Sequence, residues 1–188
     1  MESLSRILGS SARLRLLRLF LFNQDLSLTL AEIAGRAKIS PAAARGAVAE
    51  LFAAGLLRKK AGTPLRYQVN PHYQHRAALE TFIRQTTNIR PVDVIRILKK
   101  AGALRLVVLS GLFTGSIEPQ IDLLVVGDSL SDRVLAGAVR HLEAELGREI
   151  RYAAFSTPDF RYRLGVYDRL IRDVLDYPHQ VLFDKIGL

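Results

Sequence analysis

The 188-residue sequence contains no cysteine and no tryptophan, and it has a single methionine. The absence of cysteine excludes disulfides, zinc sites with thiolate ligands and thiol nucleophiles, and it is compatible with a reducing cytoplasm. No run of 18 apolar residues occurs, so we expect no membrane-spanning helix and no membrane partner. The first residues, MESLSRILGSS, lack the pattern of a signal peptide. We therefore expect a cytoplasmic protein.

Histidine is also scarce. The sequence has four histidines, and only His72 and His75 lie close together. This pair falls in a segment that we expect to be an exposed helix, where a surface pair is favoured over a metal site. We predict no metal ion and no cofactor.

Acidic residues are few in the first half of the chain. Residues 1–90 hold 14 Lys and Arg against 5 Asp and Glu, whereas residues 91–188 hold 13 against 13. The formal net charge of +9 therefore comes from the first half alone. Such segregation favours a polyanion bound by the first half, because uniform basicity would not locate one.

The segment TLAEIAGRAKISPAAARGAVAELFAAGLL predicts two helices joined by a tight turn. Thr29 and Glu32 have the spacing of a capping box, so a helix begins near residue 30. Ser40 and Pro41 have the N-cap and first-position preferences of a second helix. Gly55 is suited to end that helix. The pattern is typical of a helix-turn-helix that reads DNA.

The second helix has a distinct face of small residues. We expect Ala44, Val48, Leu51 and Phe52 to form its buried stripe. Small side chains opposite that stripe allow a helix to enter the major groove closely. The residues expected on this outer face are Ala42, Ala43, Arg45, Gly46 and Ala49.

The next segment, LLRKKAGTPLRYQVN, alternates around a Gly-Thr-Pro turn and predicts a β-hairpin. With a first helix in residues 10–23, the order of elements resembles the winged helix-turn-helix of small bacterial and archaeal regulators, over residues 4–70. The resemblance implies binding of double-stranded DNA. The implied contacts are Ser40, Ala42, Ala43 and Arg45 on the second helix and Arg58, Lys59, Lys60 and Arg66 on the wing.

Two other interpretations of this half remain open. One is an all-α core module with a surface hairpin, and the other is a winged helix that binds protein. A gel shift on random duplex DNA at low salt separates them from a DNA reader. Residues 71–90 are expected to form a linker helix, either pairing with a second copy or acting as a spacer. Because one recognition helix covers a half-site, we expect a homodimer.

From residue 91 the pattern changes to alternating helices and strands. We expect a short helix at residues 91–102, strands at 104–111, 120–128 and 149–156, helices at 131–148 and 157–177, and a last strand at 179–184. This order predicts an α/β unit on a small mixed sheet, and hence an α+β chain overall.

A strand ending in Gly111, a short loop and then IDLLVVGD resemble the DNA polymerase beta-type nucleotidyltransferase core, especially its minimal branch, over residues 91–184. The resemblance implies a nucleotide site at Gly111, Ser116 and Asp122. The sequence departs from the family pattern, because Gln120 replaces the first carboxylate and Leu112 replaces the serine after the glycine.

The strand expected to supply a third carboxylate offers Arg151 and Ala153. Two Mg²⁺ ions need several anionic oxygen ligands, so we predict no catalytic residues and no nucleotide transfer. For Asp122, pairing with an arginine or ending a turn is favoured over metal ligation.

The sequence thus predicts a two-domain transcriptional regulator. Residues 1–70 would form a winged helix-turn-helix domain, 71–90 a linker helix, and 91–188 a degenerate nucleotidyltransferase-like domain. The last would serve dimerisation, sensing of a nucleotide effector, or docking of a protein partner. The alternative is an active nucleotidyltransferase that modifies a protein, as in a toxin–antitoxin pair, with the winged helix as autoregulator.

Overall fold

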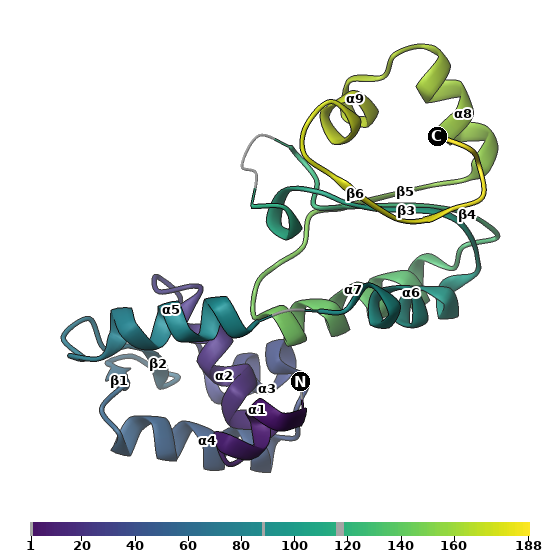
Figure 1. Cartoon of the computed structure of the whole chain (residues 1–188). Helices are drawn as coiled ribbons and strands as arrows, with labels where there is room; N and C mark the ends of the chain where they lie inside the picture. Colours follow the sequence, from purple (N-terminus) through teal and green to yellow (C-terminus); the bar gives the residue numbers. More distant parts are fainter. Residues whose placement is uncertain (1, 88, 116–118) are drawn as a thin grey trace. The chain divides into compact units, whose positions relative to one another are not determined.

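A computed structural model describes residues 2–87, 89–115 and 119–188 (Figure 1). It is an α+β structure with a two-stranded and a four-stranded sheet, in agreement with the predicted mixed class. Tertiary contacts divide it into two units, Met1–Ile89 with Arg140–Arg148, and Arg90–Val139 with Glu149–Leu188. Within the described ranges, no helix is both long and apolar enough to cross a bilayer.

The first unit is mainly helical and ends in a hairpin and one further helix. Its strands β1 and β2 pair antiparallel, with Arg58 opposite Gln68 and Lys59 opposite Tyr67. The elements are α1 (Glu2–Ile7), α2 (Ser11–Leu21), α3 (Leu30–Ala37), α4 (Pro41–Ala53), β1 (Leu57–Lys60), β2 (Arg66–Val69) and α5 (Arg76–Thr86).

The predicted caps of α3 and α4 are confirmed. The Thr29 hydroxyl accepts from the Glu32 N–H at 3.3 Å, and the Glu32 carboxylate accepts from the Thr29 N–H at 2.7 Å. The Ser40 hydroxyl accepts from the Ala43 N–H at 3.2 Å at the start of α4. Gly55 follows α4 with φ +79°, the left-handed conformation that its position requires.

The core of the first unit includes one side of α5 and corrects one expectation for α4. Most residues of α5 are exposed, but Ile83 is completely buried and Leu79 packs against the same core. Phe52 is not buried, since 41% of it is exposed, and Ala47 takes its place in the buried stripe of α4. Phe52 lies one residue beyond Leu51, and a 3.6-residue helix turns it out of the stripe.

The C-terminal turns of α7 (Asp132–Leu146) belong to the first unit, although the helix begins in the second. The buried Arg18 guanidinium on α2 donates to the Glu145 carbonyl at 2.7 Å and to the Thr87 hydroxyl at 3.0 Å. The Asn23 amide donates to the Gly147 carbonyl at 2.6 Å. Residues 140–148 are therefore hydrogen-bonded to α2 and the residues that follow it, which the sequence pattern did not indicate.

The second unit is built on the four-stranded sheet, in the order β5-β4-β3-β6. β3 pairs antiparallel with β4 and β6, and β4 pairs parallel with β5, so the predicted mixed sheet is confirmed. Its elements are α6 (Pro91–Leu98), η1 (Lys99–Ala101), β3 (Ala103–Leu109), η2 (Gly111–Phe113), β4 (Leu123–Asp128), the start of α7, β5 (Tyr152–Phe155), α8 (Thr157–Gly165), α9 (Arg169–Leu175) and β6 (Gln180–Asp184).

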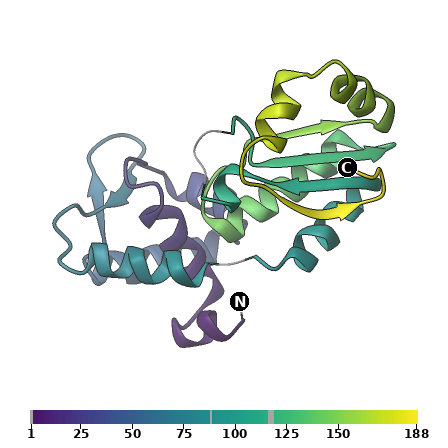
Figure 2. The ribbon, with the colours of Figure 1, turned by 45° about the horizontal axis from the view of Figure 1, so that its top comes forward.

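Alternate residues of the central strands face α8 and α9. Leu106 of β3 and Leu124 of β4 belong to one cluster of buried apolar side chains that includes residues of both helices. Figures 1 and 2 show α8 and α9 over one face of the sheet and α6 over the other. The cluster comprises Leu106, Val108, Ile121, Leu124, Val126, Phe160, Ile171 and Val174.

The single helix expected over residues 157–177 is two helices. Tyr167 takes a left-handed conformation, φ +55°, after α8. The N–H of Tyr167 donates to the Leu164 carbonyl, and that of Asp168 to the Arg163 carbonyl, as in a Schellman motif. Asp168 then caps α9 by accepting from the Leu170 N–H at 3.0 Å. The break was missed because tyrosine, not glycine, occupies the left-handed position.

Candidate nucleic-acid interface

Helix α4 presents a face of small side chains next to one arginine. Ala42, Arg45, Gly46 and Ala49 are exposed, as expected, whereas Ala43 is half-buried against the core. A Cβ added to Gly46 would meet no atom within 4 Å. Within the described part of the chain, the Arg45 guanidinium has no hydrogen-bond or ion-pair partner. This face thus carries small side chains and one positive charge.

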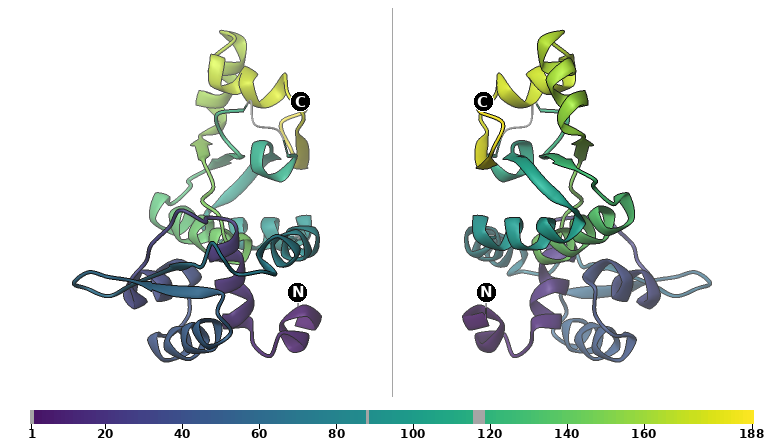
Figure 3. Two further views of the ribbon diagram at one scale, coloured as in Figure 1. Left: turned by 90° about the vertical axis from the view of Figure 1, so that its left-hand side faces the viewer. Right: turned by 90° about the vertical axis from the view of Figure 1, so that its right-hand side faces the viewer.

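The β1–β2 hairpin projects beyond the helices of the first unit (Figure 3), and its strand β1 carries three exposed basic residues. The Lys59 ammonium lies 5.0 Å from the centre of the exposed Phe52 ring, a cation–π distance. Arg58 is oriented by Gln68, whose amide oxygen accepts from Nε and Nη2 at 2.7 and 2.6 Å in the orientation that satisfies both groups. Lys60, at the end of β1, is exposed. Sequence reasoning assigned Phe52 to the core and so missed its contact with Lys59.

Arg66 differs from the other predicted contacts. Its guanidinium donates to the Ser27 carbonyl at 2.9 and 2.6 Å and to the Glu32 carboxylate at 3.0 Å. These bonds tie β2 to the segment before α3 and to its first turn. Arg66 therefore fixes the base of the hairpin. The basic residues of the hairpin strands that are exposed are those of β1: Arg58, Lys59 and Lys60.

The carboxylates of α3 and α4 are both matched by arginines. Glu32 pairs with Arg66, and Glu50, the one acid of α4, accepts from Arg13 Nε at 2.8 Å. Hydrogen bonds from the Thr29 backbone and hydroxyl hold the pKa of Glu32 below its usual value, with a further contribution from Arg66. Repulsion of a polyanion by these two acids is thus reduced, and the exposed cations set the local potential.

One basic residue at the helix turn was missed by the sequence analysis. Lys38 is exposed between α3 and α4 with φ +51°. The turn is held in place by Arg15 of α2, whose Nη1 donates to the Ala37 and Lys38 carbonyls at 3.1 and 3.0 Å. The sequence feature that could have identified it is a lysine two residues before the Ser40 N-cap.

The second unit contains the residues assigned to a nucleotide site, and Asp122 there is enclosed. Asp122 is 2% exposed, and its carboxylate accepts from the Leu112 N–H at 2.8 Å and the Arg151 N–H at 2.9 Å. The Arg151 side chain adds two bonds, from Nε at 3.0 Å and Nη2 at 2.8 Å. All of its lone-pair directions are used by protein donors.

The electrostatics of Asp122 follow from these bonds. Burial alone would raise its pKa, but the hydrogen bonds from Arg151 and from the Leu112 N–H outweigh that effect and hold the pKa below its usual value. The same pairing raises the pKa of Arg151. The Asp122 carboxylate is therefore ionised, and the Arg151 guanidinium neutralises its charge. The family resemblance implies a metal ligand at this position.

The other predicted nucleotide-site residues do not extend this arrangement. Gly111 (φ +45°) packs so closely on Asp122 that a Cβ would overlap the carboxylate. Ser116 lies outside the described residues. Gln120 is exposed, and within residues 2–87, 89–115 and 119–188 no group of three His, Asp or Glu side chains is suitably placed to hold a metal ion.

Comparisons of the chain with protein-family models, with curated proteins and with solved structures gave no significant match.

Proposed function

We propose that the protein is a DNA-binding transcriptional regulator whose first unit is a winged helix-turn-helix. In this proposal α4 is the recognition helix and the β1–β2 hairpin is the wing. The observation that carries it is the set of exposed cations on α4, on the turn before it and on the hairpin (Arg45, Lys38, Lys59 and Lys60), together with acids of α3 and α4 that are paired with arginines. Such a surface is suited to phosphate contacts and counterion release.

The residues have different roles in this proposal. Arg45, flanked by Ala42, Gly46 and Ala49, reaches a base edge or a phosphate in the major groove. Arg58, Lys59 and Lys60 contact the backbone from the wing. Ser40 caps α4 and places its first turn, and Arg66 positions the wing without contacting DNA.

Replacing Lys59 and Lys60 together with alanine tests the wing. We expect a loss of affinity of about tenfold or more, equal for all sequences, because phosphate contacts carry no sequence information. The matched control is Lys99→Ala with Lys100→Ala, an adjacent exposed lysine pair in the second unit in which Lys99 likewise lies over a ring, that of Phe183 at 5.8 Å. Fluorescence anisotropy with random duplex DNA measures both. Equal losses in the two variants would contradict the assignment of the wing.

We further propose that the second unit does not transfer nucleotides. The support is the Asp122 carboxylate, which is already saturated by Arg151 and the Leu112 N–H. With one carboxylate in place of the acids that two metal ions need, turnover is expected at background level.

Incubation of the full chain with each labelled nucleoside triphosphate, Mg²⁺ or Mn²⁺ and acceptors including the protein itself measures this. We expect no transferred label. Transfer by the wild type that disappears in Asp122→Ala would instead establish the toxin–antitoxin type of nucleotidyltransferase.

A further inference from the structure

The surface formed by α8, the turn at Tyr167 and α9 carries large apolar side chains that no element of the described part of the second unit covers. Tyr162 is 69% exposed, Val166 55% and Tyr167 76%. Tyr162 of α8 and Val166, the C-cap residue of that helix, lie four residues apart and so face the same side. Isolated exposed apolar residues are ordinary, but several adjoining ones indicate an interaction surface.

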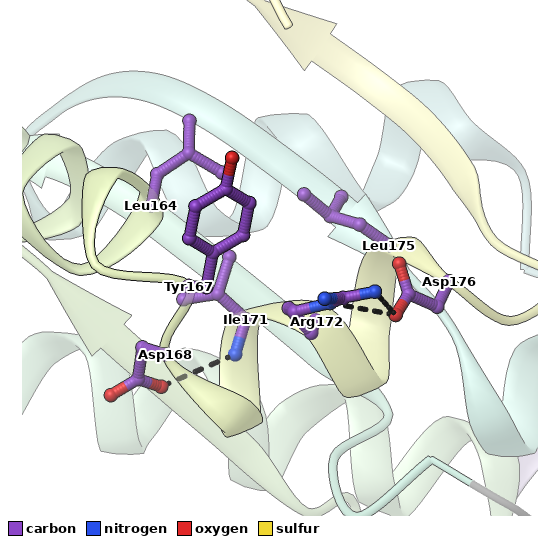
Figure 4. Close-up of a pocket in the computed structure, with 7 residues that line it drawn as sticks. All are labelled: Leu164, Tyr167, Asp168, Ile171, Arg172, Leu175 and Asp176. Atoms are coloured by element: carbon purple, nitrogen blue, oxygen red, sulfur yellow. Dashed lines mark hydrogen bonds and ion pairs between the residues drawn. The ribbon is translucent and has the colours of Figure 1, made fainter.

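A hollow of about 250 Å³ is lined in part by one of these side chains, that of Tyr167. Figure 4 shows the apolar side chains of Leu164, Ile171 and Leu175 around it, with the Tyr167 ring beside them. The Arg172–Asp176 ion pair, 2.9 Å long, lies at its edge. The surface therefore combines exposed aromatic rings with a recess bordered by an ion pair. In interfaces, aromatic side chains of this kind fill pockets on the partner.

The charges on α8 and α9 are balanced. Residues 157–176 contain four arginines and four aspartates and no lysine or glutamate. Several form pairs within the chain, such as Arg163 with Asp159 and Asp168. Tyrosine and arginine are enriched in interface cores, whereas lysine, glutamate and aspartate are depleted there and suit the polar rim.

The balance of positive and negative charge indicates which class of partner this surface suits. A polyanion or an anionic membrane would favour an excess of positive charge, which this surface lacks although the first unit has one. A two-fold interface must be complementary to itself, so each surface has to supply both the cations and the anions of its intermolecular pairs. Four arginines and four aspartates within the same twenty residues as the exposed tyrosines satisfy that condition.

We propose that α8 and α9 form the homodimer interface of this protein, with a second copy of the chain as the occupant. The proposal rests on the proposed function in one respect, since a DNA half-site reader gains affinity and specificity from a two-fold partner. In the dimer, Tyr162 and Tyr167 of each copy pack against the hollow and the aromatic side chains of the other. The arginines and aspartates at the edge pair across the two-fold axis.

The test is sedimentation of the full chain at one to fifty micromolar. We expect a concentration-dependent dimer for the wild type, and a monomer across the range for Tyr162→Glu combined with Tyr167→Glu. Both side chains are largely exposed, so these changes leave the core of the unit intact. The matched control is Val92→Glu, an equally exposed apolar position on α6, which is expected to dimerise as the wild type does. A monomeric wild type, or a double variant that dimerises unchanged, would overturn the proposal.

A second measurement locates the contact and uses the absence of cysteine from the chain. The thiol of a Val166→Cys variant is expected to react with a maleimide several-fold more slowly at fifty micromolar than at dilutions where the dimer dissociates. A Val92→Cys variant is expected to react at one rate throughout. Equal protection at both positions, or at neither, would contradict an interface at α8 and α9.

Duplex DNA binding separates this proposal from the proposed function. If the double tyrosine variant is monomeric and still binds DNA with salt-dependent affinity, both proposals stand. A wild type that binds DNA only as a monomer refutes the interface alone. A dimer lost in the double variant, together with no DNA binding by the wild type, supports the interface and refutes the DNA-binding function.

Discussion

At the scale of single residues, the partners of a charged side chain determine its role. Asp122 and Arg66 occupy positions that sequence patterns associate with ligands, yet both are held by protein groups. Arg45 and Lys60 were assigned by the same reasoning and face solvent. Sequence patterns identify which charged residues are candidates for binding, but not which of them are already paired within the protein. Those pairs join distant parts of the chain: Arg66 meets Ser27 across 39 residues, and Arg151 meets Asp122 across 29.

The Asp122 ion pair makes a prediction about stability and pH. Since its pKa is lower in the folded protein than its unfolded value of about 3.9, its stabilising contribution is present above about pH 4 and is lost as the pH falls through the folded pKa. At pH 7 we expect Asp122→Asn to cost about 1–3 kcal/mol, because Arg151 loses its counter-charge and an amide cannot accept every bond.

Hydrogen exchange of the β3 and β4 amides reports the stability of the second unit. We expect the difference between wild type and Asp122→Asn to shrink on going from pH 7 to pH 3. Asp176→Asn, which removes an exposed pair with Arg172, is the control and is expected to change stability by less than about 0.5 kcal/mol. An equal difference at both pH values would show that the charge of Asp122 does not stabilise the fold.

At the scale of elements, local signals were sufficient where the chain itself supplies both partners. The capping box of α3, the Ser40 cap of α4 and the glycine after α4 lie within a few residues of the groups they satisfy. The break between α8 and α9 was not predictable in the same way, because the chain places a tyrosine in a left-handed position that local preference assigns to glycine. Burial of α5 depends on its packing with α2, which periodicity alone does not specify.

The small-residue face of α4 can be tested without unfolding the helix. Gly46→Leu is expected to lower DNA affinity at least tenfold, because a large side chain prevents close approach of α4 to the groove. Its stability is expected to be unchanged or raised by up to about 1 kcal/mol, since leucine favours helix over glycine and open space surrounds the position.

Gly35→Leu is the matched control, because Gly35 lies on α3 and also has no atom within 4 Å of an added Cβ. We expect it to be as stable as Gly46→Leu and to bind DNA like the wild type. Thermal unfolding and anisotropy on the same samples measure both properties. A Gly46→Leu variant with wild-type affinity would show that α4 does not enter a groove.

At the scale of the whole molecule, the two halves that differ in net charge are not identical to the two structural units. The net positive charge comes from the first half of the sequence, and this half forms most of the first unit. That unit is nevertheless completed by residues 140–148, where Glu145 meets Arg18 across 127 residues. Sequence patterns therefore predicted where the two kinds of structure begin, but not that a segment from the second half would complete the first unit.

The most direct test of DNA binding by this cationic surface is the dependence of affinity on salt. Each protomer is expected to neutralise about four phosphates, so a dimer gives a slope of log affinity against log salt of about −7, since each contact contributes about −0.9. Lys59→Ala with Lys60→Ala is expected to reduce the magnitude of the slope by about 2 per protomer, and Lys99→Ala with Lys100→Ala to leave it unchanged. A wild-type slope near zero, or one that the wing substitutions leave unaltered, would contradict the account.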